Sequence, residues 1–126
     1  MKHTTFTNSF FDTFPEGMMS SLNEVPTDVD AGHMRGYLFT GRDGSQLVFW
    51  ISDEGSASSR HVHDFNEYCK IFSGTYTRIH EDGREEVFEA GSEIFFPAGE
   101  WHEGRFSKGY RALDWFEKER VKYKEQ

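Results

Sequence analysis

The chain has little cysteine, few basic residues and no long apolar run, and each shortage excludes something. Cys69 is the single cysteine in 126 residues, which excludes an intrachain disulfide and leads us to expect a reducing, cytoplasmic location. The N-terminal residues MKHTTFTNSFFDTF lack a continuous apolar segment and a small-residue cleavage pattern, so we expect no signal peptide. No segment approaches the roughly 18 apolar residues that a membrane-spanning helix requires.

Acidic side chains outnumber basic ones. Asp and Glu total 22 and Lys and Arg total 14, which gives a formal net charge of −8. Nucleic acids and anionic membranes are bound through basic surfaces. Both are therefore excluded as the main partner.

Aromatic residues are plentiful, with 13 Phe, 5 Tyr and 3 Trp. A chain of this length is most simply one domain and can bury roughly two-thirds of its unfolded surface. The rest of the composition is polar, so a few bulky rings must carry most of the burial. Such rings suit pleated, half-buried surfaces.

Short apolar-rich runs alternate with turn residues from about residue 35 to 117. The intervening GRDG, EDGR, PAGE and KG carry the Gly, Asp and Pro chemistry of hairpin loops. Because no helical period interrupts this rhythm, it predicts an all-β fold, an antiparallel barrel or sandwich. The nine expected strands are 35–40, 45–52, 59–64, 67–73, 75–80, 85–90, 92–98, 101–107 and 109–116.

The two ends differ from this central region, and the expected division is an extension over 1–34, a barrel over 35–117 and a charged tail over 118–126. Thr13 and Glu16 have the spacing of a capping box, which predicts a short helix through residue 22. The following residues, 23–33, are expected to form a loop or an edge strand.

Two histidines and a glutamate stand close together in the segment SRHVHDFNEY. In a strand, residues two apart face the same side, so His61 and His63 should project together. A turn at 64–66 would return Glu67 on the neighbouring strand, facing the same interior. Two imidazoles and one carboxylate make an open site for a divalent transition metal. A surface HxH pair without function is the alternative.

A third histidine follows a Pro-x-Gly turn in the segment GSEIFFPAGEWHEGRF, residues 91–106. At this point the sequence resembles the cupin superfamily, and specifically its small single-domain bacterial members. The family's first motif is matched in every spacing, and its second motif is matched up to the histidine. The matching residues are Gly55, His61, His63, Glu67, Gly74, Gly91, Pro97, Gly99 and His102.

The resemblance implies a jelly-roll barrel, also called a double-stranded β-helix, that holds one metal ion inside. Transferred position by position, the ligands would be His61, His63, Glu67 and His102. The ligand types suit iron, manganese, nickel, zinc and copper alike. The resemblance also implies a homodimer and a small-molecule ligand or substrate.

One position departs from the family pattern, because Phe106 replaces an asparagine of the second motif. That asparagine is not a metal ligand in the family, so coordination should be unaffected. Phe106 shares its side of the strand with His102, so its ring should point inward. It would either make the pocket wall near the metal apolar or simply fill the barrel floor.

Cys69 and Ile71 should share the inward face of their strand with Glu67 and so line the pocket. Cys69 would serve as inert packing or, alternatively, as a soft ligand or redox-sensitive thiol.

Three further side chains are expected near the pocket. Tyr76 and Arg78 lie on the next strand, and Asp114 lies on the last. Tyr76 and Asp114 are the candidate catalytic residues, and Asp114 would act as general base or as the partner that orients a histidine. A surface carboxylate is the alternative for Asp114.

A metal site of this kind is compatible with several functions, because fold and ligands do not determine a reaction. The first hypothesis is a metal-dependent enzyme acting on a small oxygenated molecule, of dioxygenase or isomerase type. The second is a non-enzymatic cupin that binds or senses a small molecule. The third, a scaffold with an empty site, would leave several polar groups without partners.

Overall fold

Ten strands and one short 3-10 turn form the regular structure of the computed structural model in the residues that it describes, 19–26 and 34–120. The 3-10 turn is η2 (Ser21–Asn23). The strands are β1 (Glu24–Val25), β2 (Met34–Thr40), β3 (Gln46–Ser52), β4 (Ser56–His61), β5 (Glu67–Ser73), β6 (Tyr76–Ile79), β7 (Glu85–Phe88), β8 (Glu93–Phe96), β9 (His102–Phe106) and β10 (Tyr110–Phe116).

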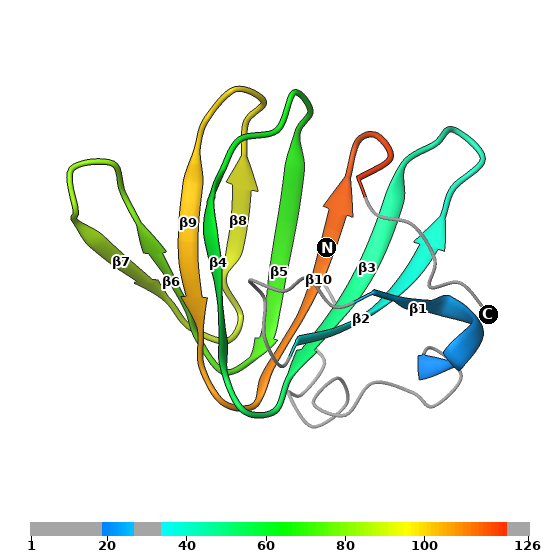
Figure 1. Cartoon of the computed structure of the whole chain (residues 1–126), viewed down its shortest axis with the longest axis horizontal. Helices are drawn as coiled ribbons and strands as arrows, with labels where there is room; N and C mark the ends of the chain where they lie inside the picture. Colours follow the sequence, from blue (N-terminus) through cyan, green and yellow to red (C-terminus); the bar gives the residue numbers. More distant parts are fainter. Residues whose placement is uncertain (1–18, 27–33, 121–126) are drawn as a thin grey trace, which may run out of the picture.

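The strands form two antiparallel sheets that face each other (Figure 1). The larger sheet has the order β1-β2-β3-β10-β5-β8, and the smaller has the order β4-β9-β6-β7. Along the chain, β3 is followed by β4 in the other sheet, and β8 is followed by β9 in the same way. This exchange of strands between two sheets is the arrangement of a jelly roll. The all-β fold predicted from the turn rhythm is therefore confirmed.

The interior lies between the two sheets and is filled by alternate residues of their strands. In β5 the inward residues Glu67, Cys69 and Ile71 are all less than 7% exposed, as the strand period predicts. One group of packed side chains surrounds Ile71 and Tyr110, and a second surrounds Leu38 and Phe116.

The strand prediction needs one correction that matters for the site. The segment expected at 59–64 forms β4 at Ser56–His61 instead, so the strand starts earlier and ends at the first histidine. The backbone of 62–66 is irregular. His63 therefore lies beyond the strand.

The N-terminal expectations are only partly within the described residues. The predicted capping box at Thr13 and Glu16 lies outside them. Of the helix expected through residue 22 only residues 19–22 are described, and Ser21 and Leu22 belong to the 3-10 turn η2. Of the segment 23–33, Glu24 and Val25 form an edge strand on β2. No helix among the described residues has the length and hydropathy needed to cross a membrane.

Gly104 on β9 allows the two central strands of the smaller sheet to pack around a tyrosine ring. It stands opposite Arg78 in the β6–β9 register. A Cβ atom at this position would lie 2.2 Å from Cε2 of Tyr76, whose ring is buried. An overlap of this size with a packed ring requires the ring or the strand to move.

We predict that Gly104→Ala lowers the free energy of unfolding by about 1–3 kcal/mol, the usual cost of overpacking. Alanine is the better strand former, so a loss would identify steric overlap as the cause. Urea denaturation measures the change. Glu103→Ala, one position away on the outward side, should stay within about 0.5 kcal/mol. Equal midpoints for the parent and Gly104→Ala would contradict the prediction.

Candidate metal centre

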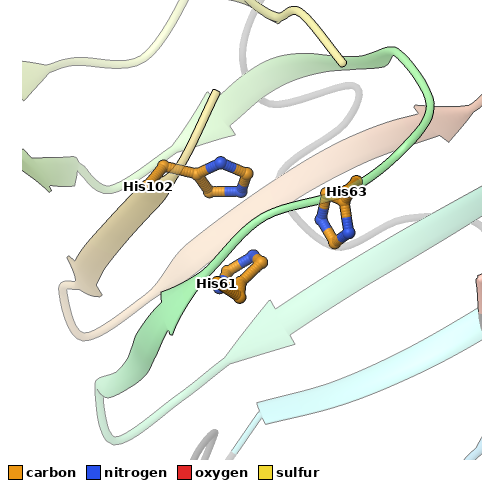
Figure 2. Close-up of side chains that lie close together, drawn as sticks. All are labelled: His61, His63 and His102. Carbon is orange, nitrogen blue, oxygen red and sulfur yellow. The ribbon is translucent and has the colours of Figure 1, made fainter. Parts of the chain in front are cut away.

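Three histidines converge at one end of the interface between the sheets. His61 ends β4, His102 begins β9, and the two are partners in the β4–β9 register. The ring centroids of His61 and His102 are 4.1 Å apart, and those of His61 and His63 are 4.8 Å apart. One nitrogen of each of the three rings lies within 4.8 Å of the other two, and Figure 2 shows the three side chains grouped together. This group could hold a metal ion.

His63 reaches this group from a loop and not from the strand that carries His61. The prediction that His61 and His63 project together because they alternate along one strand was therefore wrong in its reason, although the two rings do lie close together. The loop is held by the turn between β8 and β9, where the Gly99 N–H donates to the His63 carbonyl at 2.8 Å. Gly99 has φ +84°, a conformation that favours glycine. The Pro-x-Gly turn thus positions the loop of His63 as well as the strand of His102.

Asn66 is a positioning residue that the sequence reasoning missed. Its side-chain oxygen accepts a hydrogen bond from the Ala98 N–H at 2.9 Å, and its own N–H donates to Glu117 Oε2 at 3.0 Å. The loop is therefore tied to the β8–β9 turn and to the chain after β10. An asparagine in a turn often bonds nearby backbone, but its actual partners lie 32 and 51 residues away. The sequence contains no local signal for them.

Glu67 begins β5, and β5 belongs to the larger sheet. We expected Glu67 on a strand next to that of His61, but β5 and β4 belong to different sheets. The carboxylate therefore approaches the histidines from across the interior. Its Oε1 lies 3.3 Å from His63 Nε2 and 3.8 Å from His102 Nε2. Although the first distance is short, the alignment is not that of a hydrogen bond, and both atoms are without such a partner.

The unpaired polar atoms at this point test whether the residues suit a metal ion. His63 Nε2 and Glu67 Oε1 are buried and have no hydrogen-bond partner among the described residues. Buried polar groups normally have partners, so a cluster without them indicates a missing group. Imidazole nitrogen and carboxylate oxygen are ligands of divalent transition metals. The donor set therefore fits a metal ion.

Three phenylalanines surround the histidines, and the sequence reasoning did not assign them to the site. Phe65 stacks on His63 with centroids 4.7 Å apart, and Phe96 contacts His102 at 4.4 Å. Phe116 packs edge-on against His63 at 6.4 Å. These rings keep the polar groups in an apolar environment, which strengthens electrostatic interactions there.

Burial controls the protonation of the cluster. It lowers the pKa of His102 to about 3, assisted by the neighbouring imidazoles of His61 and His63. It lowers the pKa of His63 to about 4, with a smaller contribution from the Arg120 charge. The same burial raises the pKa of Glu67. Both imidazoles are therefore neutral at pH 7, the form that binds a metal ion.

Asp114 and Cys69 lie behind Glu67. They are partners in the β10–β5 register, and Asp114 Oδ1 is fully shielded. Burial, and then the charge of Glu67, raise the pKa of Asp114 well above its ordinary value. Burial likewise raises the pKa of the Cys69 thiol, whose Sγ is 3.7 Å from the hydroxyl of Tyr110. These surroundings correspond to packing more than to a reactive thiol.

The remaining predicted residues lie on the inner surface at different depths. Phe106 packs between Tyr76 and Tyr110, with centroid distances of 5.3 and 4.9 Å. Burial raises the pKa of Tyr76, so its hydroxyl stays protonated. Ile71 is completely buried, and Arg78 is buried beside the β8–β9 turn.

We predict that the rings of His63 and His102 titrate with midpoints near 4 and 3 in the metal-free protein. Because these pKa values lie below the ordinary 6.5, the unfolded chain takes up the protons first, and both groups lower stability as the pH falls from 6.5 to 4. The raised pKa of Glu67 acts in the opposite direction, so the rings must be measured directly.

Imidazole proton resonances followed by NMR from pH 8 to 3 give both midpoints. His63→Gln and His102→Gln assign the signals. Midpoints near 6.5 would show that the rings are hydrated and would contradict the prediction.

The matching family is described as "Cupin domain", over residues 48–115. Among solved structures, an RmlC-like cupin from Shewanella frigidimarina is 20% identical with TM-score 0.60, covering 73% of this chain and 82% of its own. KdgF from Halomonas sp. is 16% identical with TM-score 0.62, covering 74% and 84%.

The polyketide cyclase RemF from Streptomyces resistomycificus is 20% identical with TM-score 0.62, covering 81% of each chain. A comparison with curated proteins finds no match. At these identities the structural likeness shows the fold alone. The family match spans more than half of the chain, and the fold and the histidine cluster agree with it. The chain belongs to the cupin family.

Proposed function

We propose that this cupin is a metal-dependent enzyme that acts on a small oxygenated molecule. The observation that carries the proposal is the convergence of His61, His63 and His102 beside Glu67, where His63 Nε2 and Glu67 Oε1 are buried without a hydrogen-bond partner among the described residues. A binding site for a metal explains both the convergence and the missing hydrogen-bond partners. A purely structural cluster would require partners that the described residues do not supply.

The proposed ligands are His61, His63 and His102, with Glu67 as the fourth. The ligand types do not select one metal, so iron, manganese, nickel, zinc and copper remain candidates. A bound divalent ion would supply Lewis-acid polarisation of a substrate oxygen, or redox chemistry where the ion is iron. Neutral imidazoles at pH 7 and the surrounding phenyl rings favour such chemistry by providing ligands in their binding form in a dry environment.

Asp114 is proposed to orient Glu67, beside which its carboxyl group is buried. The high pKa of Asp114 favours a proton on that group, so one carboxylate and one carboxylic acid would stand side by side. A general-base role for Asp114 is less favoured by the same pKa. Tyr76, with its hydroxyl protonated, is retained only as a candidate proton donor.

The reaction type is proposed as dioxygenation or isomerisation. Fold similarity does not choose between them, because cupin scaffolds host many reactions. A cytoplasmic location and a homodimer remain predictions from the sequence and from the family. Light scattering of the purified protein distinguishes the dimer from the monomer.

We predict that the protein purified without added metal contains one divalent transition-metal ion per chain. His61→Ala and His102→Ala should weaken metal affinity at least about 100-fold, because loss of a direct ligand exceeds the effect of losing an outer partner. Elemental analysis and calorimetry measure the content and the affinity. His80→Ala is the matched control, since His80 contacts Glu86 at 3.0 Å on the outer hairpin. Full metal content in His102→Ala would remove this histidine from the site.

We predict that the metal-loaded protein turns over at least one compound among diketones, enediols and hydroxy acids. Consumption in air but not under argon, with two oxygen atoms gained by the product, would identify a dioxygenase. Equal consumption in both, with a product of unchanged mass, would identify an isomerase. His61→Ala and His102→Ala should lower the rate at least about 100-fold. Tight, metal-dependent binding without chemical change would instead support the alternative, a small-molecule binding or sensing cupin.

A further inference from the structure

Arg78 is a buried cation on the inner face of the smaller sheet. It lies on β6, points inward like Tyr76 two residues before it, and is 9% exposed. In the part of the chain that the structure describes, every other arginine and lysine is more exposed. Burying a charge costs free energy unless partners compensate it, so the partners of the Arg78 guanidinium indicate whether it is held for a ligand.

The guanidinium of Arg78 is hydrogen-bonded to the β8–β9 turn through one of its nitrogens, Nη2. Its Nη2 donates to Glu100 Oε1 at 2.5 Å and approaches the carbonyl of Trp101 at 3.3 Å. Its Nε is buried and has no hydrogen-bond partner in the part of the chain that the structure describes. The β8–β9 turn therefore holds Nη2, while the Nε–H lacks an acceptor among the described residues. An unpaired buried N–H of this kind calls for an acceptor, which residues 19–26 and 34–120 do not provide.

The side chain of Arg78 shares a neighbour with His102. Glu100 and Trp101, which hold Arg78, directly precede His102 in the chain. The guanidinium carbon of Arg78 lies 5.6 Å from the ring centroid of Phe96, and that ring also contacts His102, with centroids 4.4 Å apart. Both groups therefore border the same phenyl ring on the interior side of the turn.

The charges around the site favour an anion. Glu67 is the carboxylate that faces the histidine cluster, and histidine binds a metal ion as neutral imidazole, so with a divalent ion the centre would carry one positive charge. Glu100 balances Arg78, and its half-exposed side chain places the pair close to solvent. Arg60 adds an exposed cation at the same turn, 4.7 Å from the ring centroid of Trp101. A ligand with one negative charge would balance the centre.

We propose that the substrate is a small monocarboxylic acid whose carboxylate accepts a hydrogen bond from Arg78, while a neighbouring hydroxyl or carbonyl oxygen faces the histidine cluster. This inference rests on the proposed function and narrows its substrate class. A carboxylate fits better than a phosphate, because the centre has one charge to balance and Nε offers a single unpaired donor. Arg78 would thus select the acid over its neutral analogue.

The chain offers a matched control in Arg105. It lies on β9 beside the same sheet, its side chain is half exposed, and it forms an ion pair with Glu85. Arg105→Gln removes the same charge as Arg78→Gln without touching the interior. Glu100→Gln is the complementary variant, because it keeps Arg78 and removes only the charge that neutralises it.

The experiment measures binding of lactate, lactamide and inorganic phosphate by calorimetry to protein whose metal content has been determined. The parent protein should bind lactate at least about 10-fold more tightly than lactamide and also more tightly than phosphate. Arg78→Gln should abolish the preference for lactate with unchanged metal content. Arg105→Gln should leave it intact, and Glu100→Gln should strengthen lactate binding several-fold.

The outcomes separate this inference from the proposed function. Absence of metal in the parent protein would overturn the proposed function itself. Bound metal together with no lactate preference, with tighter phosphate binding, or with a preference that survives Arg78→Gln would overturn only the role of Arg78. If circular dichroism shows that Arg78→Gln does not fold, Glu100→Gln decides, and unchanged or weaker lactate binding would refute the inference.

Discussion

The hydrogen bond from the Gly99 N–H to the His63 carbonyl is the contact on which the site depends. It joins the turn before β9 to the loop after β4, and so positions His63 beside His61 and His102. Register pairing of β4 with β9 brings His61 and His102 together but cannot place His63, which lies beyond the strand. A glycine with positive φ is needed because the N–H must turn toward that loop. Gly99 of the second cupin motif therefore helps to position His63 of the first motif.

Burial then gives the cluster its chemical character. The phenyl rings around His63 and His102 exclude water, which keeps both imidazoles neutral and leaves the facing carboxylate of Glu67 poorly solvated. Buried, poorly solvated groups of this kind are stabilised by a bound cation, because it replaces their lost hydration. In the metal-free protein these poorly solvated groups thus lower the free energy of unfolding, and the packing of the barrel must offset that loss.

Much of the fold followed from the sequence, because turn residues and strand period are local properties. Inward positions such as Cys69 and Ile71 were predictable for this reason, and spacing identified the histidines. The sheet to which Glu67 belongs was not predictable, since it depends on which strands pair. The same holds for Asn66 and for the pair of Arg78 with Glu100, whose partners lie far away in sequence. The domain boundaries remain predictions, and so do the catalytic roles of Tyr76 and Asp114.

The link between Asn66 and Glu117 has a consequence for the end of the barrel. Two hydrogen bonds connect these residues, one in each direction, and Arg120 is held in turn by the side chain of Gln46. The segment just after β10 therefore acts as a brace for the loop that carries His63. Shortening the chain at Phe116 would leave every strand intact and yet release that loop from one of its two supports. The integrity of the centre thus extends past the last strand of the fold.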